Sequence, residues 1–135
     1  MLKRDSLTAQ MQQLSQVLAK VKRLIIEDAE TEARKVSYAI FKDYYQLDDN
    51  DLLNLSGDQF VEKIKNKNLK PEELNMLSYF IDEYAGLQDE VVQQIRLYKK
   101  YLLLVDLLEN DFHFVSLEHI SRRTVLQEQL SRLIN

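Results

Sequence analysis

Two histidines, His113 and His119, are the side chains of this chain best suited to bind a metal or to transfer a proton. A metal site on a helix needs a second ligand three or four residues away, as in Glu-x-x-His. Asn110 stands three residues before His113, and Ser116 stands three before His119. Glu109 is four residues before His113, but the apolar pattern predicts that a helix ends between them. We therefore expect surface or packing histidines, with no metal or cofactor site.

Two acidic segments are the next candidates, for cation binding or for acid–base chemistry. Segment 48–51 reads Asp-Asp-Asn-Asp, but Leu52 and Leu53 interrupt the alternating acids of a calcium loop, and Gly57 falls out of register. Segment 27–32 contains four acids, yet paired carboxylates perform acid–base work only when they are buried and face each other. Both segments are interpreted as solvated loops or helix starts.

Residues for nucleophilic or phosphate chemistry are scarce. The chain has 135 residues, no cysteine, two glycines and one proline. It contains neither a Gly-x-Ser-x-Gly elbow nor a glycine-rich phosphate loop. The lack of cysteine excludes disulfides, thiolate metal sites and a cysteine nucleophile. The sequence therefore predicts a protein that is not an enzyme.

The distribution of charge argues against nucleic acid as a partner. The net charge is −4, and acidic and basic residues are interspersed. The basic clusters are the lysines of 63–70 and the arginine pair 122–123, and the lysines are flanked by Glu62, Glu72 and Glu73. These acids largely cancel the positive field that nucleic acid or an anionic membrane would need.

The composition is that of a globular domain, and the lack of cysteine is consistent with a reducing compartment. Hydrophobic residues make up 45% of the chain and charged residues 30%. The longest aliphatic run, 102–105, is too short to span a bilayer. The charged start, 1–6, leads into no apolar core of a secretory signal. We expect one domain over 1–135, with a cytoplasmic location and no membrane partner.

Apolar residues recur at steps of three and four along most of the chain, which predicts amphipathic helices. Ser56 and Gln59 have the spacing of a capping box, and Pro71 suits the first position of a helix. Gly86 is placed to end that helix in a left-handed conformation. A short helical turn is expected at 52–55. The pattern predicts five to seven helices, no strand and an all-α fold.

The first part of the chain, 6–47, is predicted to form either one long helix or a helical hairpin, ahead of further helices over 50–134. Asp5 or Ser6 is placed to cap its start. A turn near 26–28 is favoured, since one uninterrupted helix would run about 60 Å and leave much of its apolar seam uncovered. That seam has heptad spacing and is the expected interaction surface, within the fold or between two copies. It comprises Leu7, Met11, Leu14, Leu18, Val21 and Ile25.

The most apolar helix is expected over 89–109. Two stripes predict that it is buried over a wide arc and lies at the centre of the fold. One stripe comprises Val91, Ile95, Tyr98, Leu102 and Val105, and the other Leu97, Tyr101, Leu104 and Leu108. Ser116 is placed to cap a last helix that ends near 133. Most aromatic residues lie on such stripes and are predicted to pack in the core, while some tyrosines could line a partner-binding concavity.

The segment Ile95–Leu104, with the paired amphipathic helices around it, resembles the tetratricopeptide-like class of helical repeats. The chain also resembles a family of short, uncharacterised bacterial helical proteins, through Leu52–Ser56 and Lys99–Glu109. The full repeat signature does not recur at a 34-residue period, so the array would be a degenerate one. Both resemblances imply a binding scaffold without catalytic residues.

These observations favour a non-enzymatic helical module for protein–protein interaction or scaffolding. It would offer a groove or an amphipathic helix to a protein partner whose identity the sequence does not give, or to a second copy through the heptad seam. The alternative is a regulatory helical bundle that binds a small ligand in its tyrosine-rich interior. An enclosed apolar cavity would favour that alternative, and an exposed groove the interaction module.

Overall fold

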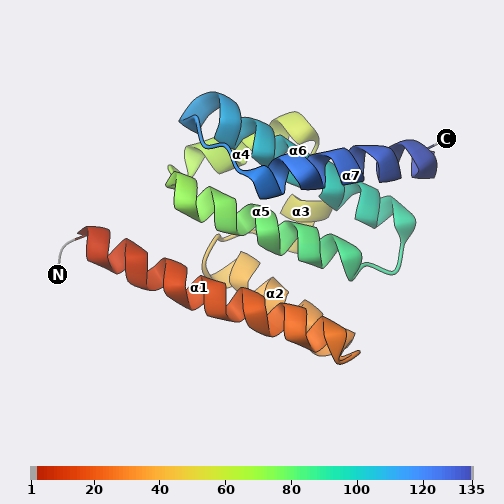
Figure 1. Ribbon diagram of the computed structural model, residues 1–135, viewed down its shortest axis with the longest axis horizontal. Helices are drawn as coiled ribbons and strands as arrows, with labels where there is room; N and C mark the ends of the chain where they lie inside the picture. The colour runs from red at the N-terminus through yellow and green to blue at the C-terminus, as the bar shows by residue number, and fades with distance from the viewer. Residues whose placement is uncertain (1–2, 135) are drawn as a thin grey trace.

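The computed structural model describes residues 3–134, which form α-helices joined by short connections and contain no strand (Figure 1). The all-α prediction is confirmed, and the number of helices in this part is at the upper end of the expected range. The helices are α1 (Lys3–Ile26), α2 (Glu30–Asp43), α3 (Asp49–Leu53), α4 (Gly57–Asn66), α5 (Pro71–Gly86), α6 (Val91–Phe112) and α7 (Leu117–Ile134). No helix of the described residues is both long and apolar enough to cross a membrane.

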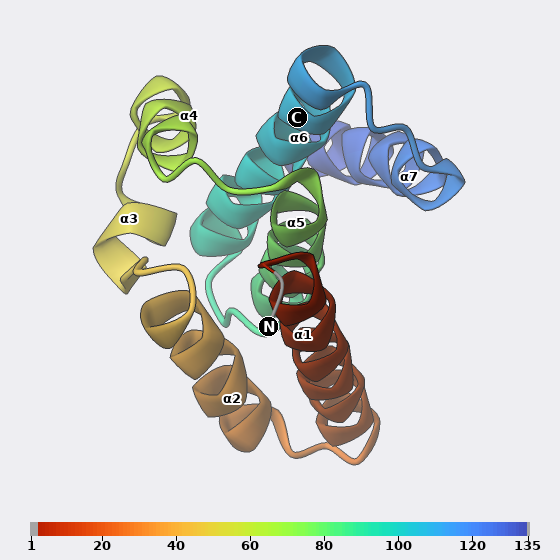
Figure 2. The ribbon, with the colours of Figure 1, turned by 90° about the vertical axis from the view of Figure 1, so that its left-hand side faces the viewer.

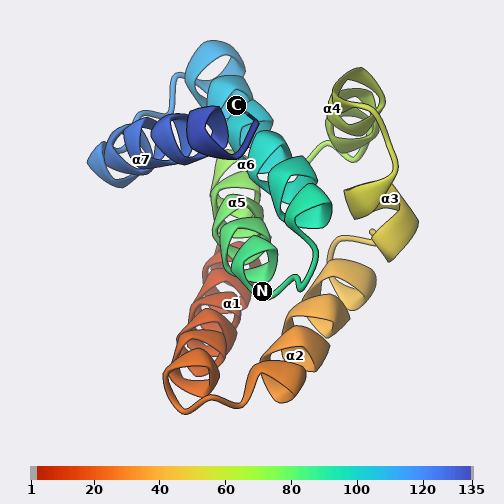
Figure 3. The ribbon, with the colours of Figure 1, turned by 90° about the vertical axis from the view of Figure 1, so that its right-hand side faces the viewer.

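The antiparallel pair α5 and α6 forms the centre of the molecule and shares its most extensive contact. The hairpin of α1 and α2 packs on α5, and α1 runs alongside α5 in the same direction (Figure 1). Helices α3 and α4 lie against one side of α6, while α7 crosses its other side (Figures 2 and 3). Helix α6 therefore separates two unlike faces of the molecule.

The predicted central position of α6 is confirmed. Leu97, Leu104 and Leu108 are fully buried, and Tyr101 is nearly so. The other predicted stripe is only partly buried, and Val91 at its start is 49% exposed because α6 begins there. Aromatic rings fill the core between the hairpin and α5, where the Phe41 ring lies 5.1 Å from that of Tyr84 in an edge-on arrangement.

The N-terminal segment is a hairpin, as favoured. Helix α1 ends at Ile26, and Asp28 turns the chain with a φ of 60°. The predicted cap at Asp5 or Ser6 is wrong, because the helix already includes Lys3. Helix α2 begins after Ala29 without a side-chain cap.

The capping predictions for the middle of the chain are confirmed. The Gln59 N–H donates to the Ser56 hydroxyl at 3.2 Å, and the Ser56 N–H donates to the Gln59 side chain at 3.2 Å. Pro71 opens α5. The short helix predicted at 52–55 lies three residues earlier, as α3, because Asp48 caps it.

The left-handed role predicted for Gly86 is wrong. Gly86 is the last residue of α5, but neither glycine has a positive φ. Residues other than glycine take left-handed conformations after helices, and His113, with a φ of 54°, does so after α6, which extends to Phe112 rather than to Glu109. The backbone N–H of His113 donates to the Leu108 carbonyl, so a satisfied hydrogen bond offsets the cost of the left-handed conformation.

Candidate functional site

The heptad seam of α1 is used mainly inside the molecule. Leu14 is 4% exposed and Val21 is fully buried, because α1 packs on α2 and α5. The other four seam residues are half-buried. At the N-terminal end of the seam, Leu7 and Met11 line an open hollow with Met76 of α5. This end of the predicted interaction surface therefore faces a space that another molecule could enter.

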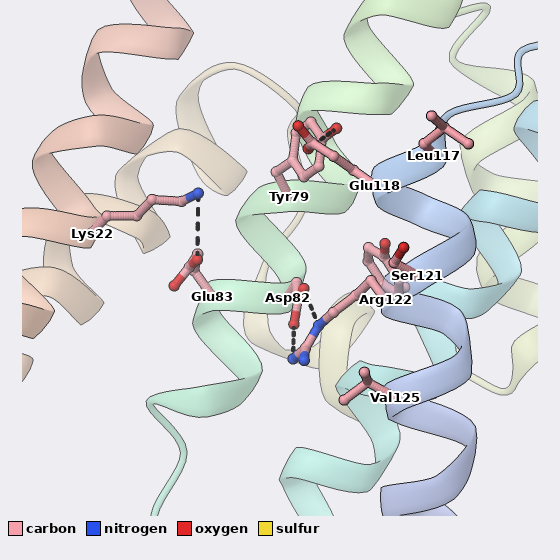
Figure 4. A pocket seen from close by; sticks show the side chains of 10 residues that line it. Lys22, Tyr79, Asp82, Glu83, Leu117, Glu118, Ser121, Arg122 and Val125 are labelled. Atoms are coloured by element: carbon pink, nitrogen blue, oxygen red, sulfur yellow. Dashed lines mark hydrogen bonds and ion pairs between the residues drawn. The ribbon is translucent and has the colours of Figure 1, made fainter.

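A cleft of about 540 Å³ opens between α1, α5 and α7, with α6 at its floor (Figure 4). It is the candidate functional site, because it combines exposed apolar side chains with charged groups held by defined partners. The lining residues are Lys22 on α1, Tyr79, Asp82 and Glu83 on α5, Tyr101 on α6, and Leu117, Glu118, Ser121, Arg122 and Val125 on α7.

Helical spacing explains how these side chains converge. Asp82 and Glu83 follow Tyr79 on α5 by three and four positions, so each lies near Tyr79 one turn further on, with Asp82 toward α7 and Glu83 toward α1 (Figure 4). Glu118, Arg122 and Val125 follow the same spacing along α7. The cleft therefore lies between facing sides of α5 and α7, and α1 borders it.

Below the cleft, His119 joins three helices. Its Nε2 lies 2.6 Å from the Asn75 amide oxygen on α5, and its Nδ1 lies 2.7 Å from the Tyr101 hydroxyl on α6. An amide oxygen only accepts hydrogen bonds, so Nε2 carries the proton and Nδ1 accepts from Tyr101. The Tyr79 ring stacks on the imidazole at 5.0 Å. Each polar atom of the imidazole thus has a partner.

Burial keeps this network neutral. His119 is 2% exposed and Tyr101 is 1% exposed. Burial lowers the pKa of His119, and burial raises the pKa of Tyr101, so both groups are uncharged at pH 7. The prediction of packing or surface histidines is confirmed in both forms, because His119 packs in the interior while His113 is exposed at the end of α6.

The charged groups of the cleft are held by specific partners. The Arg122 guanidinium donates two hydrogen bonds to the Asp82 carboxylate, both of 2.8 Å, and lies 5.7 Å from the centre of the Tyr98 ring. The Tyr79 hydroxyl donates to Glu118 at 2.9 Å. These contacts fix α7 across α5 and orient the walls of the cleft.

At the other wall, Lys22 of α1 reaches Glu83 of α5 at 4.0 Å (Figure 4). This ion pair is loose and partly solvated, so its contribution to stability is small. Burial is the main cause of a raised pKa for Glu83. Glu83 is therefore a partly desolvated carboxylate beside an open space.

Two apolar side chains of α7 remain exposed at this cleft. Leu117 is 83% exposed and Val125 is 47% exposed. The side chains of residues 6–133 form no group of three or more His, Asp or Glu that could hold a metal ion. The arrangement of fixed polar groups beside exposed apolar ones suits recognition of another molecule.

From the sequence, the two acidic segments are interpreted as solvated, and the structure differs from that interpretation at Asp51. Asp48 and Asp51 form a reciprocal capping box at α3, as expected of capping acids. Asp51 is 7% exposed rather than solvated, because its carboxylate also contacts the Lys63 ammonium at 2.6 Å. Hydrogen bonds from Lys63 and from the Asp48 backbone lower the pKa of Asp51 against the opposing effect of burial.

Sequence reasoning did not find the His119 network or the Asp82–Arg122 pair. The partners of His119 come from positions 44 and 18 residues away, so no local motif marks them. One signal was present: His119 precedes the buried Leu126 by seven residues and Leu130 by eleven, which places it on the apolar face of α7.

The described residues form an all-α, single-domain helical protein with an open cleft lined by polar and apolar side chains. The chain matches no protein-family model, no curated protein and no solved structure. The resemblance to tetratricopeptide-like arrays therefore stays a prediction.

Proposed function

We propose that this protein is a non-enzymatic interaction module whose cleft between α1, α5 and α7 binds a segment of a partner protein. The observation that carries the proposal is the exposure of Leu117 and Val125 beside side chains that are already fixed by hydrogen bonds. Burying a leucine or valine side chain fully stabilises a complex by about 1.5–3 kcal/mol. Preorganised polar groups around them reduce the entropic cost of binding.

The charges of the cleft indicate what the partner segment carries. Arg122 is neutralised by Asp82, and Lys22 is only loosely paired with Glu83. Glu118 accepts from the neutral Tyr79 hydroxyl and forms no ion pair with a side chain of residues 6–133. The best-matched occupant is a helical or extended segment that presents two apolar side chains and a lysine or arginine.

A second copy of the chain is a less suitable occupant of the α1 seam than the sequence suggested. Leu14 and Val21 are buried within the fold, so a dimer through the whole seam would require α1 to leave α5. We place the module in the cytoplasm, which the lack of cysteine and the mixed charge support.

Photo-crosslinking in cells of the native host tests the proposal. A photoreactive phenylalanine analogue would replace Leu117 or Val125. In the control, the same analogue would replace Lys35, which is exposed on α2. We expect one protein adduct shared by positions 117 and 125 and absent at position 35. Leu117→Asp should abolish the adduct at 125 without changing the melting temperature, because Leu117 is exposed. Adducts equal at all three positions would contradict the proposal.

The alternative, a small-ligand-binding regulatory bundle, is favoured by the volume of the cleft. About 540 Å³ falls within the usual range for small-molecule sites. The cleft is open rather than enclosed, however, which suits a peptide segment better. Native mass spectrometry of the protein purified from its host separates the two: a stoichiometric small molecule, lost in the variant Tyr79→Ala, would support the alternative.

A further inference from the structure

On the opposite side of α6 from α7, the Lys100 side chain is largely buried and its ammonium group has no carboxylate partner. Lys100 is 4% exposed, yet none of the ion pairs among the side chains of residues 6–133 includes it. The Lys100 ammonium lies 5.7 Å from the centre of the Phe60 ring, which offers a weak cation–π contact. Buried charges in proteins are normally paired, so this one calls for a partner.

The lysine lines a cleft of about 510 Å³ between α6 and the 53–57 segment that joins α3 to α4. Arg96 and Lys99 line the same cleft, and their spacing from Lys100 places all three on one side of α6. Arg96 donates to the Leu53 carbonyl at 3.2 Å, which leaves its positive charge without a carboxylate. No acidic side chain is among the lining residues of this cleft, so its field is strongly positive.

The N-terminus of α4 adds to that field. Ser56 and Gly57 line the cleft, and the first-turn N–H groups that the Ser56–Gln59 capping box does not use attract anions. A Cβ atom at Gly57 would lie 3.0 Å from the end of the Leu103 side chain, which is tighter than most real contacts, so Leu103 would have to shift. Glycine therefore lets the start of α4 approach α6 this closely without displacing Leu103.

We propose that this cleft binds the phosphate group of a small organic phosphate, which Lys100, Arg96, Lys99 and the N-terminus of α4 hold together. The organic part would lie against the half-buried leucines of the cleft wall, Leu53, Leu55, Leu102 and Leu103. A phosphate fits better than a carboxylate, because its several acceptor oxygens match three cationic side chains and backbone N–H groups at once.

The surroundings of Lys100 favour binding of an anion. Burial is the main cause of a lowered pKa for Lys100, and the neighbouring charge of Arg96 lowers it further. A bound phosphate would reverse both the pKa shift and the destabilisation that it reflects. This site is independent of the α1–α5–α7 cleft, since α6 stands between the two (Figures 2 and 3).

Binding of phenyl phosphate to the full chain, measured by calorimetry and by thermal melting, tests the site. Wild type should bind phenyl phosphate more tightly than inorganic phosphate, and phenol should not bind. Lys100→Met should weaken phenyl phosphate binding about tenfold or more, which is the loss expected for one charged hydrogen bond. The matched control Lys35→Met, on exposed α2, should bind as wild type does.

The same variants carry a second readout. Without ligand, Lys100→Met should melt at a higher temperature than wild type, because an apolar side chain of similar size replaces an unpaired buried charge. Phenyl phosphate should then raise the melting temperature of wild type and Lys35→Met but not of Lys100→Met.

Three results would overturn the proposal. One is equal binding by wild type and Lys100→Met. Another is binding to vesicles that contain phosphatidic acid without any binding of phenyl phosphate. The third concerns the case in which Lys100→Met does not fold. The variant Lys99→Gln, at an exposed position, then replaces it, and an unchanged affinity of Lys99→Gln for phenyl phosphate would overturn the proposal.

Discussion

Removing the Tyr101 hydroxyl, in Tyr101→Phe, isolates the buried network that connects α5, α6 and α7. The hydroxyl donates to Nδ1 of His119 at 2.7 Å, and both residues are almost fully buried. The variant leaves that ring nitrogen without a donor in a site that water does not reach. An unsatisfied buried acceptor costs about 1–3 kcal/mol, so we expect the free energy of unfolding to fall by about 2 kcal/mol.

This loss converts to a measurable change in melting temperature. The entropy of unfolding is roughly 2.1 cal/mol/K per residue, which gives about 0.28 kcal/mol/K for 135 residues. A loss of about 2 kcal/mol therefore lowers the melting temperature by about 7 °C. Urea unfolding monitored by circular dichroism measures the free energy directly, and Tyr38→Phe, on the half-buried part of α2, is the matched control.

A double-mutant cycle with His119→Leu distinguishes this network from general packing. Replacing both partners by apolar groups leaves fewer unsatisfied atoms than replacing either alone, so the double variant should lose at least about 1 kcal/mol less than the two single losses combined. Additive losses, or a Tyr101→Phe variant within about 0.5 kcal/mol of wild type, would refute the assignment of the Tyr101–His119 hydrogen bond.

Three further changes test other parts of the structure. Burial lowers the pKa of His119 in the folded state, so the unfolded state binds more protons just below its ordinary pKa of about 6.5. The free energy of unfolding should therefore fall as the pH drops from 7.5 through 6.5, in wild type and His113→Asn but much less in His119→Gln. Leu104→Asp should abolish the cooperative thermal transition, since Leu104 is fully buried in α6; a wild-type melt would contradict its central position. Ser37→Ala should raise the free energy of unfolding by about 1 kcal/mol in urea titrations, because the buried Ser37 hydroxyl has no hydrogen-bond partner; a loss of stability would mean that this hydroxyl is satisfied.

Local chemistry made several elements predictable from the sequence. The Ser56–Gln59 capping box and Pro71 act through neighbours within three residues, so their spacing alone determines their role. The hairpin of α1 and α2 followed from the need to cover an apolar seam. The buried stripe of α6 followed from its period.

The turns were harder to predict, because residues other than glycine carry them. Asp28, Gln46, Asn68 and His113 all have a positive φ, and Gly86 does not. Each left-handed residue costs about 1–2 kcal/mol, which a hydrogen bond or buried contacts nearby can offset. Sparse glycine therefore correctly indicated long helices but gave the wrong position for a left-handed turn.

The candidate site could not be derived from the sequence, because its contacts join distant helices. Arg122 and Asp82 are 40 residues apart, and only the crossing of α7 over α5 brings them together. The burial of Lys100 could have been predicted from the sequence. It lies three residues after Leu97 and four before Leu104, so the helical period places a charged side chain within a buried stripe.

Two adjacent residues of α6 show how a buried polar group with a structural role differs from one that needs a ligand. Tyr101 is buried with its hydroxyl paired to His119, so the fold itself accounts for it. Lys100 is almost as buried, but its ammonium group has no carboxylate partner among residues 6–133 and lies near the Phe60 ring and the repelling charge of Arg96. Stability alone would favour an apolar side chain at position 100, whereas a bound anion would turn the same lysine into a stabilising contact. Lys100→Met should therefore be more stable than wild type and should also no longer bind phosphate. Both effects have one cause, because Lys100 has no carboxylate partner within the fold.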